Sequence, residues 1–338
     1  MLAPPVVERE LQPMNTGVKL DSRTIPVPSS ISPEAQATLQ RLVGADGVPL
    51  NALHALPAPD DHAGWRQMQA AVAQHYASAN AGQAETLRAN LHTLALENAT
   101  VHVATPATGT GFAYIDLHGG ALVFGGGENC RIAAGKQADL HDVVCYGVDY
   151  RMPPDHPYPA ALDDCMATYR HVLKHHAPEH IVIGGRSAGG NLAAAMVLRA
   201  RDEGLPLPAA LVLLSPEVDL TESGDSFQVN RTVDVVLPNS LRSANLLYAA
   251  GADVCHPYLS PLFGDFTLGF PPTFLQSGTR DLFLSNTVRL HRALRKAQVT
   301  AVLHVFEAMP HGGFMGAPED RELAAEVAQF VRQHLRRA

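Results

Sequence analysis

The sequence has 338 residues, 46% of them hydrophobic, and a formal net charge of −8. A chain of this length and composition can bury a large core, either as one large α/β domain or as two smaller domains. The acidic balance and the absence of a basic run exclude nucleic acid and anionic membrane surfaces as expected partners.

Two features predict the cellular setting. The first residues lack the positive region and long apolar run of a signal peptide, and no segment has the length and hydropathy of a membrane span. The four cysteines lack Cys-x-x-Cys spacing, which predicts reduced, mostly buried thiols rather than a disulfide framework or a zinc site. We therefore expect a cytoplasmic protein.

Residues 1–96 are predicted to form an amino-terminal extension with cap helices. The segment up to about residue 59 is rich in proline, and a helix begins near Ser32, which can cap it, with Pro33 in the first turn. Residues 64–96 are rich in alanine and place apolar side chains at helical spacing, so we expect helices here that pack on a cap or core.

The central sheet is predicted to begin at residue 99. A strand of alternating polarity and an apolar strand at 112–117 lead into His118, Gly119 and Gly120. Glycines after a strand allow close backbone approach, so the amides of Gly119 and Gly120 could face a developing oxyanion. A phosphate loop would need a lysine or an acidic residue that this segment lacks. His118 is expected to order the loop by hydrogen bonding, because it precedes the candidate nucleophile.

The next part of the chain contains a predicted helix at 130–140, a strand at 143–148, a proline-rich connection at 149–160 and a helix at 161–176. His171 and His175 stand at i and i+4 in the last helix, a spacing that could hold a metal ion. No glutamate accompanies them as in His-Glu-x-x-His, and we interpret the pair as a solvated helix face.

The motif Gly-x-Ser-x-Gly occurs at residues 185–189. The hydrophobic pattern predicts a buried strand at 181–183 and a helix at 192–201. A strand that turns sharply into a helix strains the backbone of the central serine, which requires that Gly185 and Gly189 lack side chains. The turn exposes the Ser187 hydroxyl, and the first free amide of the helix, that of Ala188, points toward a charge forming beside it. We predict that Ser187 is a nucleophile.

An acid and a histidine should follow the nucleophile in that order. The later elements are predicted strands at 211–216, 273–276 and 301–306 and helices at 285–297 and 319–335. Asp281 lies at a strand end, where a carboxylate can orient a histidine; Asp219 is the alternative acid, and Glu217 is less favoured. His311, on a Gly-rich loop after the last strand, is the predicted general base, whereas His304 within that strand is interpreted as structural.

Three segments carry a family resemblance: His-Gly-Gly-Ala at 118–121, Asp-Tyr-Arg-Met-Pro-Pro-Asp-His-Pro-Tyr-Pro-Ala-Ala-Leu-Asp-Asp at 149–164 and Gly-Arg-Ser-Ala-Gly-Gly-Asn-Leu at 185–192. Together they resemble the hormone-sensitive-lipase-like bacterial esterases of the α/β-hydrolase fold. The resemblance implies a mostly parallel central sheet flanked by helices, with a core at 97–216 and 259–338 and a helical cap insertion at 217–258. It also implies the site residues: Ser187 as nucleophile, Asp281 as acid, His311 as base, and the amides of Gly119, Gly120 and Ala188 as the oxyanion hole.

The chain departs from the family pattern at three places. Arg186 stands where the family commonly has Asp or Thr, Ala121 replaces a frequent third glycine, and two residues rather than one separate His311 from Phe314. The residues that we expect to line the substrate pocket are Ala121, Phe124, Leu220, Leu282 and Phe314.

The sequence therefore predicts a serine hydrolase that cleaves short- to medium-chain carboxylic esters through an acyl-enzyme. The expected partner is a small-molecule ester, with no metal or organic cofactor, and the resemblance is compatible with a homodimer through the sheet edge. Lactones, amides, carbonates and carbamates stay open as alternative bonds. A non-catalytic receptor on the same fold is the alternative from another class, and it is disfavoured because all three members of a triad are present.

Overall fold

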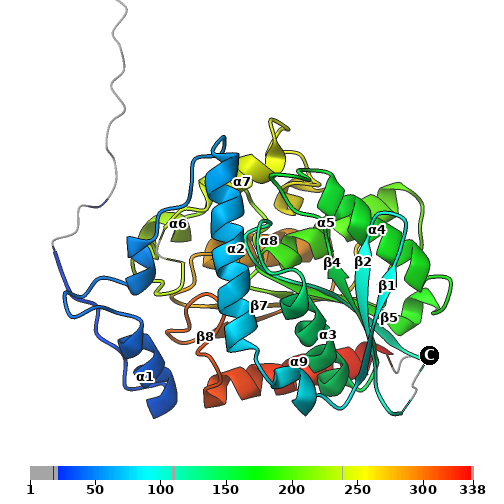
Figure 1. The fold of residues 1–338 in the computed structure, drawn as a ribbon, viewed down its shortest axis with the longest axis horizontal. Coiled ribbons are helices and arrows are strands. Elements are labelled where there is room, and N and C mark those ends of the chain that lie inside the picture. The colour runs from blue at the N-terminus through cyan, green and yellow to red at the C-terminus, as the bar shows by residue number, and fades with distance from the viewer. Residues whose placement is uncertain (1–17, 19–21, 109–110, 238, 336–338) are drawn as a thin grey trace, which may run out of the picture.

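A computed structural model describes residue 18 and residues 22–108, 111–237 and 239–335 (Figure 1). Strands in this part of the chain form an eight-stranded sheet with the order β1-β2-β4-β3-β5-β6-β7-β8. The β1–β2 and β2–β4 pairs are antiparallel, and the other pairs are parallel. The strands are β1 (Asn90–Ala95), β2 (Thr100–Thr105), β3 (Ala113–Leu117), β4 (Val144–Asp149), β5 (Ile181–Arg186), β6 (Ala210–Leu214), β7 (Thr273–Gly278) and β8 (Ala301–Phe306).

The central strands are buried on both faces, as their sequences predict. β5 reads Ile-Val-Ile-Gly-Gly-Arg and β6 reads Ala-Leu-Val-Leu-Leu, and nearly continuous apolar runs are typical of parallel strands covered by helices. The carboxyl ends of parallel strands lie at one edge of the sheet. The loops after β3, β5, β7 and β8 therefore open at the same edge, and they carry the predicted site residues.

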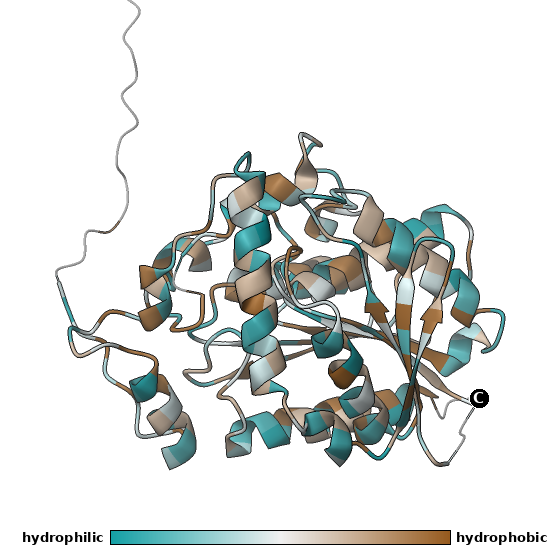
Figure 2. Ribbon diagram, in the orientation of Figure 1, coloured by the Kyte–Doolittle hydropathy of each residue, from teal (hydrophilic) through white to brown (hydrophobic). Residues whose placement is uncertain are grey.

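Helices cover both faces of the sheet. α3 (Glu128–His141) and α9 (Pro318–Leu335) pack on one face, where Ala134 and Phe330 belong to the same hydrophobic cluster. α4 (Ala160–Val172), α5 (Ala188–Asp202) and α8 (Leu284–Lys296) pack on the other face, and most of α5 is buried. Figure 2 shows this division, with hydrophobic residues along the strands and hydrophilic residues on the outer sides of the helices.

Two segments that are distant in the sequence lie together beside the loop after β3. The amino-terminal segment contributes Trp65 and the segment after β6 contributes Leu247, and both contact a cluster that contains Val123. Farther along the edge, Leu39 of the first helix packs in a cluster with Phe314. The helices of these segments are α1 (Pro33–Arg41), α2 (His62–Ala79), α6 (Ser226–Val229) and α7 (Arg242–Ala249), with a 3-10 turn at Leu50–Leu53.

One stretch that was predicted to be helical contains a strand instead. α2 ends at Ala79, and Asn90–Ala95 forms the edge strand β1. Leu91 and Leu94 are half-buried, and their three-residue spacing would place them on one side of a helix, whereas in the strand they pack on opposite faces of the sheet. The strand forms because the short turn at 96–99 brings β1 against β2 as a hairpin.

Other local predictions are confirmed. Ser32 caps α1 by accepting a hydrogen bond from the Ala35 amide, and Pro33 occupies the first turn. The four cysteines are free thiols, and three of them are buried.

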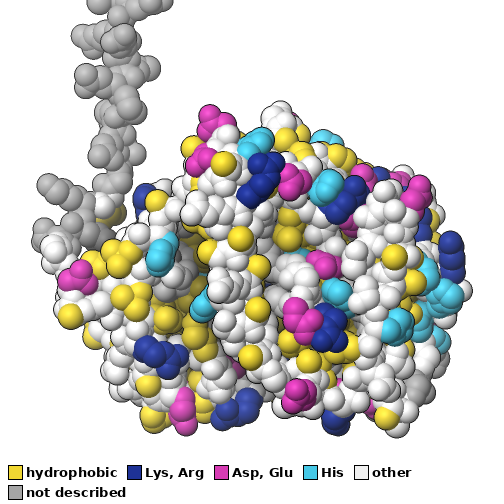
Figure 3. Space-filling model, in the orientation of Figure 1, with side chains coloured by type: hydrophobic (Ala, Val, Ile, Leu, Met, Phe, Trp, Pro, Cys, Tyr) yellow, Lys and Arg dark blue, Asp and Glu magenta, His cyan; other side chains and the backbone are white. Residues whose placement is uncertain are grey.

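The described part of the chain contains no helix that is both long and apolar enough to cross a membrane. On the face seen in Figure 3, basic and acidic side chains are interspersed and no extended region has a single sign.

Candidate active site

Ser187 occupies the sharp turn between β5 and α5 that the sequence predicts. Its backbone has a φ of 57° and a ψ of −123°, a conformation that is strained for a residue with a side chain. A Cβ atom on Gly185 would lie 2.2 Å from the Gly189 carbonyl oxygen, and a Cβ atom on Gly189 would lie 1.8 Å from the Leu117 carbonyl oxygen. Neither contact is sterically possible, so the turn requires glycine at both positions. The Ser187 amide donates to the Leu214 carbonyl at 2.9 Å and ties the turn to β6.

The backbone of the loop after β3 lies directly against this turn. A Cβ atom on Gly119 would lie 3.4 Å from the Ser187 Cβ atom and 3.0 Å from the Arg186 carbonyl oxygen. The Ala188 amide, at the first position of α5, has no acceptor within the helix. Within the described ranges, the amides of Gly119, Gly120 and Ala188 donate no hydrogen bond to another residue. Three backbone donors are therefore available for a negatively charged oxygen.

His118 orders the glycine loop, as predicted. Its Nδ1 lies 2.9 Å from the Gly119 carbonyl oxygen, and its ring stacks on Tyr150 with centroids 4.0 Å apart. The Tyr150 hydroxyl donates to the His118 carbonyl at 2.8 Å. Burial lowers the pKa of His118, which keeps the ring neutral. Gly120 adopts a φ of 128°, and the Phe124 amide closes the turn by donating to the Gly120 carbonyl at 2.8 Å.

Asp281 and His311 form a buried pair. His311 Nδ1 lies 3.0 Å from Asp281 Oδ1, and the two residues are 7% and 0% exposed. Asp281 Oδ1 also accepts from the Phe283 amide at 2.9 Å, and Oδ2 accepts from the Ser277 hydroxyl at 2.6 Å. Burial alone would raise the pKa of Asp281, but the neighbouring His311 and the hydrogen bonds outweigh it and hold that pKa below its usual value. An ionised Asp281 fixes the imidazole with its proton on Nδ1.

The two alternative acids have different surroundings. The Asp219 carboxylate accepts hydrogen bonds from Arg289 at 2.6 Å and from Ser223 at 2.7 Å. Both carboxyl oxygens of Glu217 are buried and have no hydrogen-bond partner. In the ranges that the structure describes, neither side chain bonds to a histidine, so His311 is paired with Asp281.

Asp234 is a site residue that the sequence analysis missed. Its carboxylate is fully buried and accepts from the Leu282 amide at 2.8 Å and from the His311 amide at 3.2 Å. It also accepts from two amides of its own loop. Burial and the neighbouring Asp281 charge raise the pKa of Asp234. Asp234 thus joins the loops of the acid and the histidine, and the only sequence signal for it is an acidic residue between valines.

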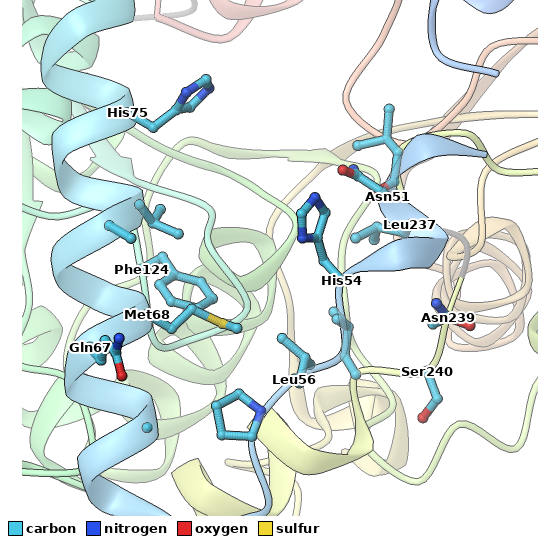
Figure 4. A pocket seen from close by; sticks show the side chains of 16 residues that line it. Asn51, His54, Leu56, Gln67, Met68, His75, Phe124, Leu237, Asn239 and Ser240 are labelled. Atoms are coloured by element: carbon cyan, nitrogen blue, oxygen red, sulfur yellow. The ribbon is translucent and has the colours of Figure 1, made fainter. Parts of the chain in front are cut away.

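A cavity of about 820 Å³ lies next to the glycine loop. In Figure 4, Met68 and His75 on α2 lie on one side of it with Phe124 next to Met68, and His54 and Leu56 lie on the other side. The residues that line it are Asn51, His54, Leu56, Pro57, Gly64, Gln67, Met68, Ala71, Val72, His75, Phe124, Val236, Leu237, Asn239, Ser240 and Leu241. The lining includes both apolar and polar side chains, which gives the cavity an amphipathic wall.

Of the five residues predicted to line a substrate pocket, Phe124 lines this cavity. Ala121 is half-buried and packs against two clusters, one containing Val123 and the other containing Leu282. Leu220, Leu282 and Phe314 are buried in hydrophobic clusters and lie outside the cavity wall. Their side chains turn toward the interior because neighbouring helices cover these loops.

Arg186, the departure from the family pattern next to Ser187, lies in the field of several carboxylates. Burial lowers the pKa of Arg186, while the carboxylates of Asp320, Asp281 and Asp116 raise it. One of its guanidinium nitrogens is buried without a hydrogen-bond partner. A cation at this position is tolerated because the charges of nearby acidic side chains, chiefly Asp320 and Asp281, act on it.

The remaining histidines that the sequence analysis singled out lie elsewhere. The rings of His171 and His175 are 4.7 Å apart on α4. No group of three or more His, Cys, Asp or Glu side chains within the described ranges could hold a metal ion. His304 pairs with Glu326 at 2.8 Å and stacks on Phe274, which agrees with a structural role.

Comparisons with known proteins agree with this architecture. Residues 114–315 match the profile of a family described as having the alpha/beta hydrolase fold. An acetyl-hydrolase of Streptomyces hygroscopicus is 34% identical over 214 residues, which are 63% of this chain and 71% of that protein. An esterase of Acinetobacter venetianus is 31% identical over 221 residues, which are 64% of this chain and 73% of that protein.

Solved structures give the same picture. The crystal structure of esterase E25 is 35% identical, covers 95% of this chain and 99% of its own, and has a TM-score of 0.87. An esterase from the bacterial hormone-sensitive lipase family is 28% identical over 90% of this chain and 99% of its own, with a TM-score of 0.74.

The sheet, the serine turn and the buried Asp–His pair define a protein of the α/β hydrolase class. Within that class, the chain belongs to the alpha/beta hydrolase fold family matched at 114–315, among the esterases of the hormone-sensitive lipase type. It is a hydrolase of carboxylic esters.

Proposed function

We propose that Ser187, His311 and Asp281 are the catalytic triad of this ester hydrolase. His311 Nε2 takes the proton of the Ser187 hydroxyl as its oxygen attacks the ester carbonyl, and a tetrahedral oxyanion forms. The imidazolium then gives the proton to the leaving alcohol, and the acyl group stays on Ser187. Water, activated by His311, releases the acid and restores the serine. The amides of Gly119, Gly120 and Ala188 stabilise the oxyanion at each stage.

The observation that carries this proposal is the buried Asp281–His311 pair at 3.0 Å, on loops at the same sheet edge as the Ser187 turn. The carboxylate stabilises the positive charge that the ring acquires when it takes the serine proton. The backbone donors need no reorganisation during the reaction, because no other acceptor in the described ranges holds them.

Ser187→Ala tests the nucleophile. We expect kcat for p-nitrophenyl acetate to fall by about 10⁴-fold or more, because the attacking oxygen is removed. Ser78→Ala, at an exposed serine of α2, is the control and should retain full activity. Unchanged esterase activity in a folded Ser187→Ala variant would refute the assignment.

The substrates are short- to medium-chain carboxylic esters, with the carbon chain in the cavity beside Phe124. A volume of about 820 Å³ is within the usual range of small-molecule sites, and most of the lining side chains are apolar. The name acetyl-hydrolase of the Streptomyces relative supports a short acyl group.

A pair of α2 variants tests this cavity. Val72 lines it, whereas Ala73 is exposed and does not. Val72→Trp should lower kcat/KM for p-nitrophenyl octanoate relative to the acetate by about tenfold or more, because the indole fills the space of the chain. Ala73→Trp should leave this ratio unchanged. Equal effects of the two variants, or equal losses on both esters, would contradict the use of the cavity.

A homodimer through the outer sheet edge is the second part of the proposal. β8 is an edge strand of the described sheet, and its Val302 and Val305 are 37% and 42% exposed. An exposed apolar edge favours pairing with another strand. Light scattering should give twice the chain mass for the wild type and the single-chain mass for Val305→Asp. A monomeric wild type would refute the dimer without affecting the triad.

A further inference from the structure

Glu217 is a buried acid that the proposed reaction does not use. It follows β6, is 1% exposed, and both of its carboxyl oxygens are buried without a hydrogen-bond partner. An ionised carboxylate in such a place would carry a large desolvation penalty, whereas a protonated carboxyl carries a much smaller one.

The backbone of Glu217 is bonded to the nucleophile turn on both sides. Its amide donates to the Ser187 carbonyl at 3.1 Å. Its carbonyl accepts from the Asn191 side-chain amide at 2.8 Å, and Asn191 also donates to the Leu259 carbonyl at 2.7 Å. Asn191 lies in the first turn of α5, four residues after the serine. A displacement of Glu217 would therefore move both Ser187 and the first amides of α5.

Two asparagine side chains that donate to the backbone of this loop leave acceptors without donors. Asn191 donates to the Glu217 carbonyl and Asn245 to the Leu220 carbonyl, while Oδ1 of each is buried without a donor. Asn245 is also close enough to act on the Glu217 carboxyl. A proton on Glu217 converts one of its carboxyl oxygens into a donor. Without that proton, the carboxyl group carries a buried negative charge and can only accept hydrogen bonds.

The charged surroundings favour the same state. Burial and the negative Glu222 in the same loop raise the pKa of Glu217 to about 8, although the side-chain amide of Asn245 in α7 lowers it. Asn245 is neutral, and the Asn191 side chain of α5, which donates to the Glu217 carbonyl, is neutral too. Asp219, two residues away, is bound to Arg289. No cation is among the described groups that act on the Glu217 pKa.

We propose that Glu217, as a neutral carboxylic acid, is a positioning residue that holds the Ser187 turn and the first turn of α5 in their active arrangement. Carboxylic acids that stay neutral in apolar sites are known to serve as hydrogen-bond donors. When Glu217 loses its proton, the carboxylate is drawn toward water, and the backbone bonds to Ser187 and Asn191 weaken. The reaction then slows through kcat, while substrate binding is preserved. This inference depends on Ser187 being the nucleophile.

The test is the pH dependence of kcat and KM for p-nitrophenyl acetate between about pH 6 and 10. In the wild type, kcat should fall above about pH 8 with little change in KM. Glu217→Gln keeps a neutral side chain of the same shape, so it should retain kcat near pH 7 within about threefold and move the alkaline fall upward by about one pH unit or more. Glu222→Gln removes the like charge and should move the fall downward.

An alkaline fall that Glu217→Gln leaves in place would overturn the inference. So would a loss of about a hundredfold in kcat near pH 7 in a Glu217→Gln variant with native melting temperature, because the ionised form would then be required. If Glu217→Gln does not fold, the pH profile of kcat in Glu222→Gln is compared with that of the wild type. An alkaline fall at the same pH in both proteins would also overturn the inference about Glu217. An active Ser187→Ala variant would instead refute the triad, so the two failures are distinguishable.

Discussion

Replacing Asp281 by asparagine isolates the charge of the proposed acid from its geometry. The Phe283 amide donates to Oδ1 at 2.9 Å, so the asparagine oxygen must occupy this position. The asparagine NH2 group then faces Ser277, whose hydroxyl can rotate to accept. The oxygen beside His311 is thus retained, and the imidazole keeps its proton on Nδ1. What is lost is one negative charge.

The size of the loss follows from the separation of the charges. His311 Nδ1 and Asp281 Oδ1 are 3.0 Å apart, which places the charge centres about 4 Å apart. Two unit charges about 4 Å apart at an effective dielectric constant of about 20 interact by about 4 kcal/mol. That energy stabilises the imidazolium in the transition state, so Asp281→Asn should lower kcat/KM about a thousandfold.

The assay is steady-state hydrolysis of p-nitrophenyl acetate, with circular dichroism to establish folding. Asp281→Ala should be slower than Asp281→Asn, because it also leaves the histidine N–H without an acceptor. Asp219→Asn is the matched control and should stay within about tenfold of the wild type. A folded Asp281→Asn variant that retains more than about a tenth of the wild-type activity would refute the reasoning. A loss in Asp219→Asn that exceeds the loss in Asp281→Asn would assign the acid role to Asp219 instead.

Three further variants test separate parts of the account. Gly120→Ala places a Cβ atom 2.2 Å from a backbone carbonyl oxygen at a φ of 128°, so kcat should fall about 10²- to 10³-fold with little change in KM. The control Ala121→Gly, at a φ of 52°, should keep a kcat near that of the wild type. Equal activity of the two variants would contradict the oxyanion role. Asp234→Ala leaves two buried amides, those of Leu282 and His311, without an acceptor. It should lower the unfolding free energy in urea by about 2–6 kcal/mol and also lower kcat, and Asp234→Asn should have a smaller effect on both. An unchanged midpoint of urea unfolding would refute this role. Burial raises the pKa of Asp116 from 3.8 to about 7, so the wild type loses stability as the pH rises between these values. Asp116→Asn should therefore be more stable than the wild type by up to about 4 kcal/mol at pH 8 but not at pH 4. A difference in stability that does not depend on pH would contradict the buried neutral acid.

The parts of the site that follow from local rules could be predicted from the sequence. The Ser187 turn is local, because Gly185 and Gly189 must both lack side chains between a buried strand and a helix. Asp281 and His311 each follow a strand of a parallel sheet, and such loops gather at one edge. The sheet itself follows from short apolar runs separated by helical segments.

Features that depend on long-range packing could not be predicted in this way. Asp234 bonds to amides 48 and 77 residues away, and nothing in its own segment identifies those partners. Leu282 and Phe314 follow the proposed acid and base closely in the sequence, and Leu220 follows Asp219, but the packing of neighbouring elements turns all three into the core. The cavity wall comes instead from α2, residues 51–57 and the 236–241 segment, which are far apart in the sequence.

The role of Ser187 is tested most directly by covalent labelling with a fluorophosphonate, followed by intact-mass measurement and peptide mapping. We expect one adduct per chain, on Ser187, with no adduct in Ser187→Ala and much slower labelling in Asp281→Asn. An unlabelled wild type, or an adduct on another residue, would contradict it.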